Sequence, residues 1–133
     1  MPTHPLAHLS TVAASLNLTS DNLTAQISLL ESHLAKLNLG IEVWIRLPDT
    51  DTADLGYGRI PDQKGRWGLL LRDQGHSWSA MSAPRHLKIS VPSAFPQLVE
   101  ALIVEAERVI GEITQAEALA KEFVRVIQEV DNA

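Results

Sequence analysis

The chain contains no cysteine, which excludes disulfide bonds, thiolate metal sites and cysteine nucleophiles. It also lacks an apolar run near the ~20 residues that a membrane span needs. The first ten residues lack the basic segment and following apolar segment of a signal peptide. We therefore expect a cytoplasmic protein that does not contact a membrane.

The common catalytic and cofactor motifs are missing as well. Gly56-Tyr57-Gly58 is followed by neither a third glycine nor a helix, so it does not form a dinucleotide loop. Asp73 and His76 lie near Ser77, but no strand-turn-helix elbow surrounds a serine, and such clusters are typical of turns. There is no paired-carboxylate or HExxH pattern. We expect no enzymatic activity, no metal site and no cofactor.

The charge is mildly negative and unevenly distributed. The net charge of the 133 residues is −5. Eight acidic residues follow Ser93 against three basic ones, whereas seven of the eleven basic residues lie between residues 41 and 91. The C-terminal part would repel nucleic acid, and the middle of the chain would not.

In the N-terminal third, the apolar pattern predicts one helix over about residues 20–38. Large apolar residues recur there at steps of three and four: Leu23, Ile27, Leu30, Leu34 and Leu37. Residues 1–18 contain a weaker pattern of the same kind, in Leu9, Val12, Ala13 and Leu16. We interpret residues 1–18 as a loosely attached N-terminal segment of a single domain that spans residues 1–133.

Between residues 41 and 91 the apolar period changes to two, which is typical of strands with one buried face. We predict strands over residues 41–47, 55–60, 66–72, 77–81 and 87–91. A loop over residues 62–65 would place Ile60 opposite Trp67 in a hairpin. The expected fold is α+β and two-layered: an antiparallel sheet of about four or five strands, packed on the N-terminal helix and on a long helix or helical hairpin over about residues 93–130.

The C-terminal segment is too long for the domain that it belongs to. An unbroken helix over residues 93–130 would measure ~55 Å, whereas a compact domain of this length is only about 35–40 Å across. The helix must project, break or find a partner. Gly111 is a candidate break, but the apolar pattern keeps its phase through that glycine. This favours one continuous helix over a hairpin.

The apolar pattern of this helix supplies the first candidate site. Large and small apolar residues alternate at steps of three and four from Val99 onward, through Leu102 and Ala106. The part beyond Ala106 is the association stripe, through which we expect a homodimer: Val109, Ile113, Ala116, Ala120, Phe123, Val124, Ile127 and Val130.

The outer face of the sheet supplies the second candidate site. If the predicted strands keep their alternation, that face gathers aromatic and basic side chains: Trp44, Arg46, Tyr57, Arg59, Arg66, Arg72, His86 and Lys88. Such a surface could stack bases and pair with phosphates, or bind an acidic protein. Solvated strands also carry arginine and lysine without any ligand. A one-residue change of register would scatter the set.

The sequence as a whole predicts a small, non-enzymatic interaction or assembly protein. In this interpretation it self-associates through the C-terminal helix. The alternative is a nucleic-acid-binding module that uses the outer sheet face. The sequence names neither a pathway nor a particular partner.

Overall fold

The computed structural model describes residues 4–61 and 63–133; Asp62, which we placed in the hairpin loop, and residues 1–3 lie outside the described part. The elements are α1 (Pro5–Lys36), β1 (Val43–Arg46), β2 (Ala53–Arg59), β3 (Trp67–Asp73), β4 (His76–Ser79), the 3₁₀ turn η1 (Ala80–Ser82), α2 (Arg85–Lys88) and α3 (Val91–Asp131). This confirms the α+β class with an antiparallel sheet and a long C-terminal helix.

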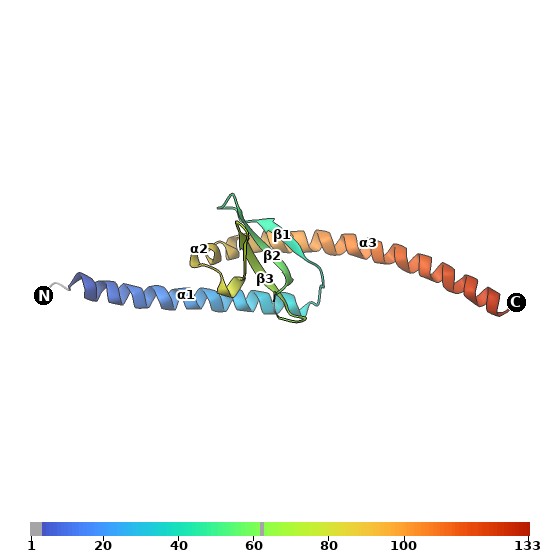
Figure 1. Ribbon diagram of the computed structural model, residues 1–133, viewed down its shortest axis with the longest axis horizontal. Helices are drawn as coiled ribbons and strands as arrows, with labels where there is room; N and C mark the ends of the chain where they lie inside the picture. The colour runs from blue at the N-terminus through green and yellow to red at the C-terminus, as the bar shows by residue number, and fades with distance from the viewer. Residues whose placement is uncertain (1–3, 62) are drawn as a thin grey trace.

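The four strands form one antiparallel sheet in the order β1-β2-β3-β4. One face of the sheet packs on both long helices, with α3 against β1 and β2, and α1 against β3. Figure 1 shows that each helix extends well beyond the sheet: the N-terminal part of α1 at one end of the molecule, and the C-terminal half of α3 at the other.

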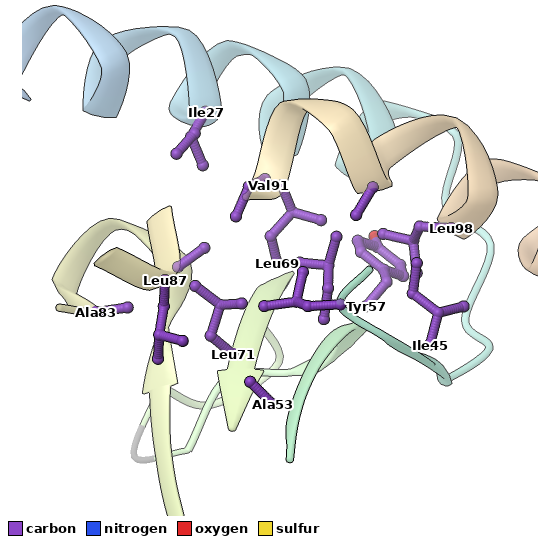
Figure 2. Close-up of a cluster of buried hydrophobic side chains, with 14 of the residues drawn as sticks. Ile27, Ile45, Ala53, Tyr57, Leu69, Leu71, Ala83, Leu87, Val91 and Leu98 are labelled. Atoms are coloured by element: carbon purple, nitrogen blue, oxygen red, sulfur yellow. The ribbon is translucent and has the colours of Figure 1, made fainter. Parts of the chain in front are cut away.

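The core lies between this face of the sheet and the helices. Ile27 of α1, Leu98 of α3 and Leu69 of β3 are completely buried there, and Figure 2 shows their side chains pointing toward one another. Leu87 of α2 closes one end of the cluster. The core therefore uses only the middle of the molecule, and the projecting parts of both long helices lie outside it.

Helix α1 begins about fifteen residues earlier than expected. The ring nitrogen Nδ1 of His4 accepts a hydrogen bond from the Leu6 amide at 3.1 Å, and Pro5 occupies the first turn, where a missing N–H costs nothing. The helix continues through Ser20, where we had placed its start. It ends before Asn38, which adopts a left-handed conformation with φ of 51°, as asparagine tolerates.

Two sequence-based predictions about the strands are wrong. Residues 87–91 are not a strand: Leu87 and Val91 lie four apart, so helical turns bury both, and Ile89 between them is exposed. The β2–β3 hairpin is shifted by one residue, because Trp67 pairs with Arg59 instead of Ile60. This shift puts Leu55 and Tyr57 in the core, which buries far more apolar area than two glycines would.

Candidate interaction surfaces

The C-terminal part of α3 is one unbroken helix that leaves the domain. Residues 107–131, which we call the α3 arm, are exposed apart from the half-buried Val109. The helix passes through Gly111 without a break, which confirms the continuous helix. Its large apolar side chains are more than two-fifths exposed, among them Ile113, Phe123, Val124, Ile127 and Val130 of the association stripe. Ala116 and Ala120 are exposed between them.

The charges of the α3 arm lie beside the association stripe and on the opposite side of the helix. Arg108 contacts Glu105 and Glu112, Lys121 contacts Glu117, and Arg125 contacts Glu122 and Glu129, all three or four residues apart. The hydrogen bond from Arg108 lowers the pKa of the Glu105 carboxyl below its ordinary value. These ion pairs use all three basic residues of the arm, and the apolar stripe beside them contains no charged residue.

An apolar notch lies where the α3 arm leaves the domain. It has a volume of about 130 Å³, and it is lined by the end of α1 and the segment after it together with one face of α3: Leu34, Leu37, Leu39, Val99, Leu102, Ile103 and Ala106. Leu34 and Leu102 are buried at its floor, whereas Leu37 and Ile103 are at least half exposed at its rim. No prediction from the sequence included this site, because its walls come from segments sixty residues apart.

The outer face of the sheet holds a compact cluster instead of a broad basic surface. The Trp44 ring lies over Gly56, and the Arg72 guanidinium carbon lies 3.9 Å from the centroid of that ring. Asp54 accepts hydrogen bonds from Arg46 at 2.7 Å and from Arg72 at 2.9 Å. Two of the predicted cations therefore share one carboxylate.

Asp54 responds to both guanidinium groups. Burial on its own raises the pKa of Asp54, but the hydrogen bonds from Arg72 and Arg46 outweigh that effect and hold the pKa below its ordinary value. The carboxylate stays ionised and neutralises part of the positive charge that the sequence predicted for this face.

The other residues predicted for the outer face lie elsewhere. Tyr57 is 1% exposed and faces the helices as part of the core. Arg59 is paired with Trp67 and lies 5.5 Å from its ring, on the same face as Tyr57. Arg66 reaches Glu31 of α1. The corrections for Tyr57 and Arg59 follow from the shifted hairpin register, whereas Arg66 lies in the turn before β3.

His86 and Lys88 are also displaced, because their segment is helix α2 instead of a strand. The Lys88 ammonium donates to the Thr24 hydroxyl of α1 at 3.0 Å. It therefore ties α2 to α1 and does not contribute to a sheet surface. Of the eight residues predicted to gather there, the structure brings together Trp44, Arg46 and Arg72.

The sequence analysis noted a helical pattern before residue 18 but missed that it belongs to one continuous α1, and it also missed a contact of Glu31. Leu6, Leu9, Val12 and Leu16 are exposed on the projecting part of α1, and the spacing of Leu9, Ala13 and Leu16 continues the pattern of the buried Ile27 and Leu34. That continuity was visible in the sequence. Glu31 is buried, and its carboxylate accepts a hydrogen bond from the Leu69 amide at 2.8 Å. No periodicity signals such a contact.

Comparisons with protein-family models, curated proteins and solved structures found no match for this chain. Within residues 4–61 and 63–133, no three histidine, aspartate or glutamate side chains are grouped closely enough to hold a metal ion. Among the same residues, no helix is both long and apolar enough to cross a bilayer. The candidate surfaces therefore have to be judged on their own geometry.

Proposed function

We propose that this chain is a non-enzymatic assembly protein that associates with a second copy through the association stripe of the α3 arm. One observation carries the proposal: a continuous helix leaves the domain with a row of large apolar side chains in solvent. Soluble monomers rarely expose contiguous apolar patches of this kind, and such patches mark interaction sites.

The free energy gained by burying the stripe is larger than the cost of bringing two copies together. Burying five large side chains of the stripe contributes on the order of 10 kcal/mol per copy, at ~1.5–3 kcal/mol each. Two copies would double that figure, which exceeds the estimated ~4–15 kcal/mol cost of lost translation and rotation. The ion pairs of the arm use all three of its basic residues, and six acidic residues leave the arm with a net charge of −3. Exposed charges interact by about 1 kcal/mol or less and are screened by salt, so the burial of apolar side chains remains the larger contribution.

The alternative of nucleic-acid binding has weaker support. It relied on eight aromatic and basic residues on one sheet face, whereas Trp44, Arg46 and Arg72 are the ones that lie together. Asp54 contacts both of these arginines. A net negative chain with a partly neutralised patch gives little electrostatic affinity for phosphates.

Light scattering on a sizing column, at several protein concentrations, tests the proposal directly. We expect a mass of about twice the 14.6 kDa of one chain. Phe123→Glu and Ile127→Glu should shift the protein to the monomer, because each places a charge in the stripe.

Gln128→Glu is the matched control, since it adds the same charge one residue away, on the polar side of the helix. It should leave the mass unchanged. A monomer at every concentration tested for the unaltered chain would refute the proposal.

A further inference from the structure

The association stripe has the same spacing in both directions. Ala106 and the stripe residues other than Val124 follow one another at steps of 3, 4, 3, 4, 3, 4 and 3: Ala106, Val109, Ile113, Ala116, Ala120, Phe123, Ile127 and Val130. Counting back from Val130 gives the same series. Two antiparallel copies of this helix can therefore match at all eight positions at once. A parallel pair would also match, so the spacing alone does not choose between the two directions.

The apolar notch at the base of the arm favours the antiparallel direction. Val99, Leu102 and Ala106 continue the stripe into the domain, where they line the notch together with Leu34 of α1 and Leu37 just after it. Beyond Ala106 the stripe is exposed to solvent apart from the half-buried Val109, within the part of the chain that the structure describes. An antiparallel partner would bring the tip of its own α3 arm to this point, whereas a parallel partner would bring its domain.

We propose that two α3 arms pair antiparallel, with the tip of each arm seated at the apolar notch of the other copy. This inference rests on the proposed self-association. In this register Ala106 faces the partner's Val130, and Val109 faces the partner's Ile127. Ile113 then faces the partner's Phe123, and Ala116 faces the partner's Ala120. The two domains lie at opposite ends of the paired arms.

Side-chain size fits this arrangement. The twofold axis falls between Ala116 and Ala120, where the small side chains let the two helices approach closely. Ile113 and Phe123 lie on either side of that point and fill the wider space. At the base, Ala106 is the small residue beside the notch, so the partner's Val130 has room to enter it.

The area also suits a stable dimer. If Val104 is left out, nine large apolar side chains are exposed on α3 from Ile103 to Val130: Ile103, Ile110, Ile113, Leu119, Phe123, Val124, Val126, Ile127 and Val130. At roughly 60–80 Å² each, each copy would bury roughly 550–700 Å² of apolar surface. A standard interface buries about 800 Å² per partner.

Cysteine cross-linking tests the register, and the absence of native cysteine makes it clean. The full chain is prepared with Ala106→Cys and Val130→Cys together and with each alone, and is oxidised after far-UV circular dichroism has checked its fold. Within one helix the two positions lie about 36 Å apart, far beyond the ~4.4–6.8 Å of a disulfide. The double variant should therefore give a covalent dimer, and each single variant should give little.

A second pair, Ile113→Cys with Phe123→Cys, gives an independent test of the same register and should also cross-link. The matched control, Ala106→Cys with Gln128→Cys, places its second thiol on the polar side of the helix and should not. Efficient linking by Val130→Cys alone would indicate parallel arms and overturn the inference.

Other outcomes separate this inference from the proposed function. A dimeric mass without cross-linking in either cysteine pair would overturn the antiparallel register and leave self-association standing. Linking of Ala106→Cys to a Leu9→Cys chain would place the partner's α1 at the notch and would also overturn it. A monomeric mass for the unaltered chain would remove both proposals.

Discussion

Replacing Glu31 should cost this fold more than any exposed ion pair does. Strand β4 pairs with β3 only from Leu70 to Asp73, so the Leu69 amide points past the end of β4, toward α1. Glu31 is 4% exposed and accepts that amide's hydrogen bond at 2.8 Å. The carboxylate therefore completes the sheet edge that β4 leaves uncovered.

The magnitude follows from the two partners of Glu31. Losing the charge-assisted bond to a buried amide costs about 1.5–3 kcal/mol, and removing the buried Cγ methylene group adds about 0.8 kcal/mol. The second partner, Arg66, is 3.4 Å away and more than half exposed, so that ion pair contributes at most about 1 kcal/mol. Glu31→Ala should lower the free energy of unfolding by about 2.5–4 kcal/mol.

Urea unfolding measures this change in the free energy of unfolding. All variants are compared at one protein concentration, because association makes the apparent stability depend on concentration. Glu31→Gln is the matched control, because its amide oxygen still accepts from the Leu69 amide; it should cost about 1 kcal/mol. Arg66→Ala should cost no more than that. If Glu31→Ala proved as mild as Arg66→Ala, the carboxylate would not be what satisfies the edge amide, and the reasoning would fail.

Four further predictions concern other parts of the fold. Gly111→Ala should raise the free energy of unfolding by about 1 kcal/mol, since nothing lies within 4 Å of an added Cβ; a lower thermal midpoint would contradict it. Gly56→Ala should cost about 1–3 kcal/mol and change the near-UV circular dichroism, because its Cβ would lie 2.5 Å from the Trp44 ring; an unchanged spectrum would contradict it. The stability advantage of the native chain over Asp54→Asn should be full above about pH 4 and decline as the pH falls through the depressed pKa; an advantage that stays constant as acid is added below about pH 4 would rule out the ionised carboxylate as its source. Phe123→Glu should lower the helical signal in far-UV circular dichroism, whereas an equal signal at matched concentration would mean that the α3 arm is helical without a partner.

Periodicity predicted the parts of this fold that depend on one element at a time. Steps of three and four identified α3 and the C-terminal half of α1, and the phase through Gly111 predicted a continuous α3. The same periodicity failed at Leu87 to Val91, because alternation over five residues also fits a helical turn when the outer two are the buried ones. Short segments leave that choice to tertiary packing.

The prediction for the outer face of the sheet failed for a different reason. Which side of β2 is buried depends on whether Ile60 or Arg59 pairs with Trp67, and one residue of shift reverses the whole strand. The structure buries Leu55 and Tyr57 and leaves Gly56 under the Trp44 ring. No pattern within β2 alone distinguishes these two arrangements, because the deciding contact lies on another strand.

The candidate sites also differ in whether one element or several elements form them. The association stripe belongs to one helix, so the sequence contained all of it. The apolar notch needs Leu37 and Ile103 to meet, and the neutralised cluster needs Asp54 to reach Arg46 and Arg72. These arrangements are made by folding, and their residues carry no shared local signal.

The α3 arm has little of its own to keep it helical. Its side chains include many β-branched residues, such as Ile113, Val124 and Ile127, which are poorer helix formers than leucine or alanine, and Gly111 weakens it further. Each ion pair on its polar side contributes only about 0.3–0.5 kcal/mol. Helical segments without tertiary contacts are marginal in water. The contact that buries the stripe would therefore also supply the order of the helix that presents it, so the two should be gained and lost together.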